Sequence, residues 1–163
     1  KGDVVSISTN LLDCIMKPNE YLDGNLEGYN KELKINKIKN KLNSSGCLIY
    51  EDVSLCKIEP SMHSKITSWL MDSSINNNLL TIPALSENGL IEYLEKDSND
   101  YYAILHNNNL EGIIGSENID QISRKVEMKK FIGNFDSRGK GIGKRATFLF
   151  LYYVFSIKKF NKM

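Results

Sequence analysis

A short glycine-rich stretch near the end of the chain has the residue types and spacing of an anion site. Residues 135–147 read FDSRGKGIGKRAT, with glycines at 139, 141 and 143 and cations at 138, 140, 144 and 145. Glycines let a backbone turn tightly and approach a ligand closely. The apolar run FLFLYYVF follows, and it predicts a helix from about 142 to 158. The free N–H groups and the dipole of such a helix favour a phosphate or pyrophosphate.

Two common phosphate-binding motifs fit this stretch poorly. A P-loop requires a hydroxyl residue directly after its lysine, and here Arg145 follows Lys144. A dinucleotide fingerprint opens its domain with G-x-G-x-x-G, whereas the third glycine comes one residue early here and follows several predicted strands. The stretch is therefore an anion loop of another kind.

The elements that must position this loop can be predicted from the preceding sequence. Ser61 can cap a first helix whose inner face carries Ile66, Trp69 and Leu70, and Ser86 can cap a second, shorter helix. The remaining segments have strand character: residues 47–60, a hairpin of 101–106 and 110–118, and residues 123–134. This order predicts an α+β fold with a mixed, mostly antiparallel sheet flanked by helices.

The first part of the chain differs from the rest. A β-like run, VVSIS, lies within residues 1–10, and the lysine-rich residues 29–44 fit a helix loosely. We interpret residues 1–46 as an N-terminal extension, or as the end of an upstream domain or linker, and 47–163 as the domain that carries the loop. Because the first residue is Lys1 rather than Met, we expect the chain to be a segment of a longer protein.

Composition restricts the classes of function. The net charge is +1, so no overall charge attracts nucleic acid or a membrane, and we expect neither as a partner. The longest apolar run, 148–155, is much shorter than the about 20 residues that a bilayer requires. Cys14, Cys47 and Cys56 lack metal-ligand spacing, and we interpret them as free thiols in a reducing cytosol. With only two distant histidines, no metal site is expected, and the predicted location is cytoplasmic.

The loop and its surroundings resemble a known family. RGKGIG at residues 138–143 resembles the R/Q-x-x-G-x-G/A motif of the GNAT-superfamily N-acetyltransferases. VSLCKIEPSMHSKITSWLMD resembles that family's first strand and first helix, and EGIIGSENID resembles its third strand. The aromatic-rich last helix is similar to the branch that acts on ribosomal proteins, polyamines and amino sugars. The resemblance covers about residues 50–163 and implies a GNAT-like acyl-CoA N-acyltransferase fold, incomplete at the C-terminus.

The resemblance also implies an activity and a site. The reaction would be direct attack of a primary amine, on a small molecule or a peptide, on the thioester of acetyl-CoA, with no metal. The expected acetyl-CoA-binding residues are Phe131, Ile132, Gly133, Arg138, Gly139, Lys140, Gly141, Ile142, Gly143 and Lys144. Glu127, the only acid between residues 121 and 135, is the candidate general base. It is equally well explained as a solvated glutamate that pairs with Lys125 or Lys129.

The resemblance stops before the family's pattern ends. That pattern continues with a fifth strand, a fourth helix and a final hairpin, which supply the tyrosine that protonates the leaving thiolate. We therefore expect the general acid beyond residue 163, and an edge without its fifth strand could pair with another chain, for example in a homodimer. One alternative is a non-catalytic relative that binds CoA or a partner. A second alternative is a nucleotide- or nucleic-acid-binding module. It is the weaker one, because stacking on bases would need exposed aromatics, and those at 148–155 have the spacing of helix core residues.

Overall fold

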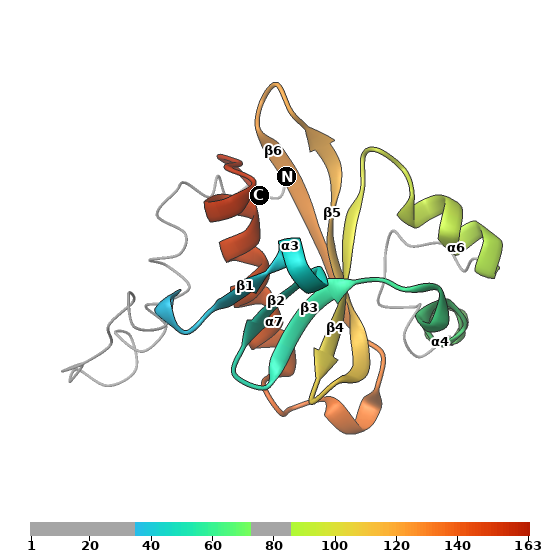
Figure 1. The fold of residues 1–163 in the computed structure, drawn as a ribbon. Coiled ribbons are helices and arrows are strands. Elements are labelled where there is room, and N and C mark those ends of the chain that lie inside the picture. The colour runs from blue at the N-terminus through green and yellow to red at the C-terminus, as the bar shows by residue number, and fades with distance from the viewer. Residues whose placement is uncertain (1–34, 73–85) are drawn as a thin grey trace, which may run out of the picture.

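The computed structural model describes residues 35–72 and 86–163 (Figure 1). The predicted strand within residues 1–10, Cys14 and the asparagine-rich stretch at 76–78 lie outside the described residues.

The described strands form one six-stranded sheet in which every neighbouring pair is antiparallel and the spatial order follows the chain. An isolated parallel bridge also joins Lys125, where the last strand begins, to Lys162. The predicted fold class, α+β with a mostly antiparallel sheet, is therefore confirmed. The strands are β1 (Lys39–Lys41), β2 (Cys47–Tyr50), β3 (Val53–Lys57), β4 (Asp100–His106), β5 (Asn109–Asp120) and β6 (Lys125–Ile132).

Helices cover both faces of this sheet (Figure 1). On one face lie α4 (Pro60–Met71) and α6 (Glu87–Leu94), and on the other lies α7 (Ile142–Leu151) with its π-helical continuation, Tyr152–Ile157. Alternate residues of β5 supply the two cores, because Ile113 packs in the cluster below α4 and α6 whereas Ile114 packs below α7. Among the described residues, no helix has the length and apolar character needed to cross a membrane.

The structure confirms one predicted helix cap and corrects the other. The Ser86 hydroxyl accepts a hydrogen bond from the Gly89 N–H at 3.2 Å and caps α6, as predicted. The predicted cap at Ser61 is wrong, because α4 already begins at Pro60 and Glu59 is its N-cap residue. Proline is favoured in a first helical turn, where its missing N–H leaves no hydrogen bond unmade.

The region before β3 also differs from the prediction. Residues 35 and 36 are helical, but β1 and the short helix α3 (Leu42–Ser45) follow in place of one helix over 29–44. Gly46, with a left-handed φ of 67°, ends α3, and β1 pairs with β2. Among the described residues the sheet thus includes Lys39–Lys41, and the division of the chain at residue 46 stays a prediction. The strand-like run 47–60 contains a hairpin, because Glu51 turns the chain with a φ of 56°.

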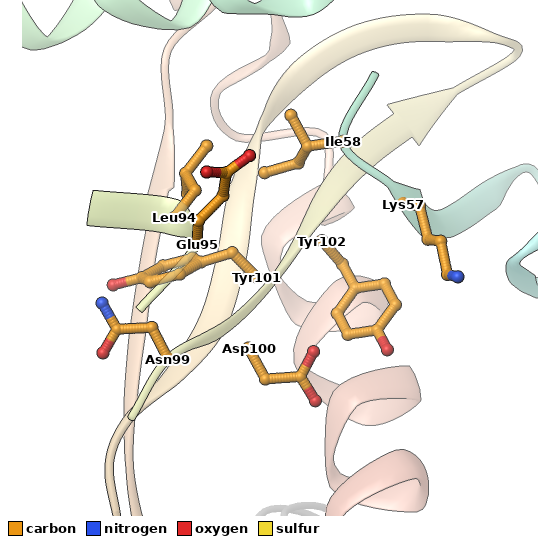
Figure 2. A pocket seen from close by; sticks show the side chains of 8 residues that line it. All are labelled: Lys57, Ile58, Leu94, Glu95, Asn99, Asp100, Tyr101 and Tyr102. Carbon is orange, nitrogen blue, oxygen red and sulfur yellow. The ribbon is translucent and has the colours of Figure 1, made fainter. Parts of the chain in front are cut away.

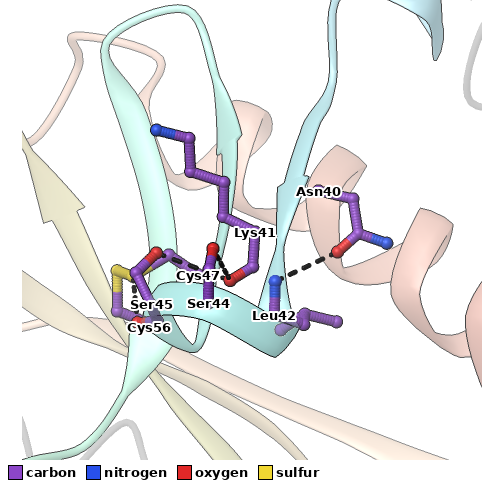
Figure 3. Close-up of a disulfide and its surroundings, with 7 residues drawn as sticks. All are labelled: Asn40, Lys41, Leu42, Ser44, Ser45, Cys47 and Cys56. Atoms are coloured by element: carbon purple, nitrogen blue, oxygen red, sulfur yellow. Dashed lines mark hydrogen bonds between the residues drawn. A yellow bond between two sulfur atoms is a disulfide. The ribbon is translucent and has the colours of Figure 1, made fainter.

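Two of the cysteines form a disulfide, which makes the prediction of free thiols wrong for Cys47 and Cys56 (Figure 3). They lie directly opposite each other on β2 and β3, with their Cα atoms 4.1 Å apart. The pairing becomes visible only once the hairpin is recognised, because it brings the two residues into register. The argument for a reducing compartment therefore no longer applies to this pair.

Removing this disulfide should lower the free energy of unfolding by about 2–3 kcal/mol. The cross-link joins residues nine positions apart and restricts the unfolded chain, so its loss favours unfolding. Urea unfolding of the double variant Cys47→Ser/Cys56→Ser measures the change. A reductant should shift the wild type to the midpoint of the variant and leave the variant unchanged. An equal response of both proteins to the reductant would contradict the prediction.

Candidate functional site

The glycine-rich loop joins β6 to α7 through a short 3₁₀ helix, η1 (Phe135–Ser137). Gly139 and Gly141 have φ values of +78° and +72°, a left-handed region in which a side chain costs about 1–2 kcal/mol. A Cβ atom on Gly143, in contrast, would be 3.7 Å from its nearest neighbour and would cause no strain. The backbone geometry therefore requires glycine at two of the three positions.

The first turn of α7 presents backbone donors at the end of this loop. Gly141 is the N-cap residue, and its carbonyl accepts hydrogen bonds from the N–H groups of Lys144 and Arg145, each at 3.1 Å. The N–H groups of Ile142 and Gly143 have no acceptor within the helix. No acidic residue lies in this first turn to offset the positive end of the helix dipole. This end of α7 therefore favours an anion.

The cations around the loop divide into two kinds. Lys140 and Lys144 are exposed, and neither forms an ion pair within residues 35–72 and 86–163. Arg145 instead contacts Asp52, with 3.0 Å between Nε and Oδ1, and it donates to the Lys140 carbonyl at 3.3 Å. His106 contacts the same Asp52 carboxylate at 3.0 Å. Arg145 thus ties the loop to the β2–β3 turn, and the two lysines stay available to a ligand.

The strand that precedes the loop offers backbone groups along an open edge. Gly133 donates its N–H to the Glu111 carbonyl of β5, whereas Val126 donates outward to Lys162. Because the donor direction alternates along a strand, the N–H groups of Met128, Lys130 and Ile132 point away from β5. Within the described residues, β6 pairs with nothing on that outer edge beyond the Lys125–Lys162 bridge. Of the predicted acetyl-CoA-binding residues 131–133, Ile132 is therefore the one whose backbone N–H points outward.

The side chains at these positions pack into the protein. Phe131 is buried below α4, with its ring edge-on to Trp69 at 6.2 Å between centroids, and Ile132 packs toward α7. Ile142, which the sequence also placed in the site, is buried in the core below α7. Phe131 and Ile142 can therefore contact a ligand only through their backbone, whereas the Ile132 side chain is partly buried. Gly133 lies directly under Trp69, because a Cβ atom there would approach the indole ring to 2.1 Å.

Replacing Gly133 by alanine should lower the free energy of unfolding by about 1–3 kcal/mol, since the added methyl group would force α4 away from the sheet. Gly143→Ala is the matched control and should cost no stability, because its Cβ atom has room. Chemical denaturation of both variants measures the difference. In a Trp69→Ala background the additional cost at Gly133 should disappear, and its persistence would contradict the proposed clash.

Glu127 lies on β6 with a half-exposed side chain. Its carboxylate accepts a hydrogen bond from the Asn118 side-chain amide at 3.0 Å and lies 3.5 Å from the Lys129 ammonium. The pairing with Lys129, one of the two readings that the sequence left open, is therefore present. An ion pair this exposed contributes at most about 1 kcal/mol, so an incoming amine can compete with it.

A second glutamate, which the sequence reasoning missed, lies directly opposite Glu127. Glu117 of β5 is buried and accepts hydrogen bonds from the hydroxyls of Tyr93 and Tyr101. Burial, and next the hydrogen bond to Glu117, raises the pKa of Tyr93 to about 12, and the same causes raise the pKa of Tyr101. Both tyrosines therefore stay protonated donors to this carboxylate. The sequence did contain a signal for this position. Glu117 lies four residues after the apolar Ile113 on the same strand, and side chains an even number of positions apart lie on the same face of a sheet.

A cavity of about 270 Å³ adjoins this glutamate cluster, and Figure 2 shows the side chains that line the cavity. Tyr101 links the two, since its side chain lines the cavity and its hydroxyl contacts Glu117. Asp100 accepts a hydrogen bond from the Tyr153 hydroxyl. No group of three or more potential metal ligands occurs among the described residues. The cavity is lined by Lys57, Ile58, Leu94, Glu95, Asn99, Asp100, Tyr101 and Tyr102.

Comparisons with known proteins identify the fold. No protein-family model and no curated protein matches the sequence. Among solved structures, spermidine N-acetyltransferase from Vibrio cholerae in complex with CoA and spermine matches with a TM-score of 0.61 and 20% identity, over 67% of each chain. The predicted resemblance is thus confirmed at the level of structure: the chain has the GNAT acetyltransferase fold.

Two further solved structures agree. A chimera of the Vibrio cholerae enzyme SpeG with hSSAT matches with a TM-score of 0.58 and 19% identity, over 68% of this chain and 67% of that chain. A probable acetyltransferase matches with a TM-score of 0.56 and 20% identity, over 69% and 68%. The chain thus spans about two thirds of the length of these relatives.

Proposed function

We propose that this chain is an acetyl-CoA-dependent N-acetyltransferase that transfers an acetyl group to a primary amine. The observation that carries the proposal is the loop between β6 and α7. Two left-handed glycines, the free N–H groups of the first turn and two lysines without an ion pair among the described residues support an anion site there, and the loop lies in a fold shared with acetyltransferases.

In this proposal the loop binds the pyrophosphate of acetyl-CoA. The donors are the backbone groups between Arg138 and Gly143 together with the ammonium groups of Lys140 and Lys144. The rest of the cofactor arm lies along the open edge of β6, where the outward N–H group of Ile132 is the nearest donor to the loop. This path holds and orients the thioester without any metal. Phe131 and Gly133 act as supports, because their backbone groups face β5.

The chemical step is attack by the nitrogen of the neutral amine on the thioester carbonyl carbon. Glu127 first takes a proton from the bound ammonium, directly or through a water molecule, and so makes the amine neutral. The C–N bond then forms and the C–S bond breaks. Negative charge develops on the carbonyl oxygen, and the outward N–H groups of Met128 and Lys130 stabilise it. As the amide forms, the nitrogen loses a second proton, and the leaving thiolate takes up a proton through solvent, so the protons of the step balance.

The exposed Glu127 carboxylate favours a cationic acceptor, since an incoming ammonium can replace the Lys129 ammonium that lies 3.5 Å from it. A polyamine, an amino sugar or a peptide amine would each suit. Where the cofactor arm leaves the edge of β6 free, this edge could pair with a second copy of the chain, so a homodimer is the assembly that we propose to test.

The proposal is tested by calorimetric titration with acetyl-CoA, followed by thiol-release assays with a panel of amines that includes spermidine. We expect saturable binding of acetyl-CoA and release of CoA with at least one amine. Absence of acetyl-CoA binding would overturn the proposal. Binding without turnover on any amine would favour the alternative, a non-catalytic CoA-binding domain, for which the geometry of the loop alone would be sufficient.

A further inference from the structure

A large aromatic side chain lies exposed just before the glycine loop. Phe135, in η1, is 49% exposed, and it is one of three large hydrophobic side chains exposed within the described residues. The backbone at Phe135 is fixed by a cap on η1: the Asn134 side chain accepts a hydrogen bond from the Asp136 N–H at 3.2 Å. An exposed aromatic ring held in this way offers a flat face on which another planar group can stack.

A guanidinium group is stacked on this ring. The Cζ atom of Arg138 lies 3.8 Å from the centroid of the Phe135 ring, and the guanidinium also donates to the Ile132 carbonyl at 3.4 Å. Arg138 has no carboxylate partner within the described part of the chain. The two side chains thus form an exposed planar surface that carries a positive charge. Aromatic rings and guanidinium planes are the surfaces on which proteins stack nucleobases.

The Phe135–Arg138 stack lies beside the phosphate-binding end of α7. Only Gly139 and Lys140 separate Arg138 from the N-cap residue of the helix. In CoA the diphosphate is covalently joined to a nucleoside, so a diphosphate bound at this helix end brings a nucleoside to the surface around the loop. Lys140 and Lys144 are exposed on the same loop and can meet the phosphate on its ribose.

We propose that the Phe135–Arg138 stack is the binding site for the adenine base of CoA. The inference rests on the proposed function. It adds a residue that makes the site bind CoA more tightly than shorter pantetheine thioesters, which lack the base. Phe135 contributes a ring face and keeps the guanidinium plane in position, so the base is recognised by shape and charge rather than by specific hydrogen bonds. The site thereby determines which acyl carriers bind tightly.

The test compares ligands with and without the base. Calorimetry measures the Kd of CoA, 3′-dephospho-CoA and 4′-phosphopantetheine for the wild type, Phe135→Leu and Phe135→Tyr. Phe135→Leu should raise the Kd of both CoA forms by about 5- to 100-fold and leave that of 4′-phosphopantetheine unchanged. Phe135→Tyr keeps the stacking face and should bind like the wild type. Ile122→Ala is the matched control, since Ile122 is exposed but lies at the opposite end of β6.

The other outcomes overturn the inference in distinguishable ways. An equal loss for all three ligands would mean that Phe135 only supports the fold of the loop, and no loss for any would mean that it does not touch the base. A loss for CoA but not for 3′-dephospho-CoA would mean that the ring acts through the ribose phosphate. A wild type that binds no CoA would overturn the proposed function together with this inference.

Discussion

Replacement of Gly141 by aspartate should raise the Kd of acetyl-CoA by at least about 100-fold. The left-handed φ of +72° strains any side chain at this position, at about 1–2 kcal/mol. The new carboxylate would also lie at the first turn of α7, where the phosphates are expected. Two unit charges about 4 Å apart near a protein surface repel by about 4 kcal/mol, so the anion site would be lost. Calorimetry at low ionic strength measures the change.

The matched control for this variant is Gly46→Asp. Gly46 also has a left-handed φ, +67°, but it lies at the end of α3, and its nearest neighbour is the flexible Lys57 side chain at 3.2 Å. It should therefore lose stability and keep its affinity for acetyl-CoA. Equal affinity losses in the two variants would show that backbone strain rather than the loop is responsible. Circular dichroism establishes that each variant is folded before it is titrated.

Replacement of Glu127 by glutamine should lower kcat by about 10²- to 10⁴-fold, the usual contribution of a general base. The affinity for acetyl-CoA should stay unchanged, because Glu127 lies six positions, about 20 Å, before Gly133 at the start of the loop. Steady-state kinetics with an accepted amine measures kcat. Glu92→Gln, which removes an exposed carboxylate on α6, is the control and should leave kcat unchanged.

The pH dependence separates a base from a structural residue. Without Glu127, the reaction must use amine that is already neutral, and that fraction rises about tenfold per pH unit up to an alkylamine pKa near 10.4. The rate of the variant should therefore approach that of the wild type as the pH rises. An unchanged kcat at neutral pH would leave Glu127 with only its ion pair to Lys129 and would exclude it as the base.

The features that the sequence predicted correctly depend on residues close together in the chain. The left-handed glycines at 139 and 141 and the first turn of α7 are encoded within a few positions, and so is the Ser86 cap. The fold class followed from the order of the elements, because alternating and helical apolar patterns differ in period. Local chemistry of this kind can be read without knowing which strands become neighbours.

The features that the sequence did not predict depend on pairings between distant residues. Arg145 was grouped with the other cations of the loop, yet its partner Asp52 lies 93 positions away. The Cys47–Cys56 disulfide requires the turn at Glu51. No glycine or proline marks this turn in the sequence, so residues 47–60 were interpreted as one strand-like run. The roles of the loop residues and of Glu127 stay predictions that the experiments above address.

The packing of Trp69 against Gly133 has a spectroscopic consequence. The chain contains a single tryptophan, and its indole ring covers the residue that leads into the anion loop. Intrinsic fluorescence excited at the red edge of the absorption band therefore reports on one location only. Emission changes during rapid mixing with a ligand would record the kinetics of events at the base of the loop, with no added dye or engineered label.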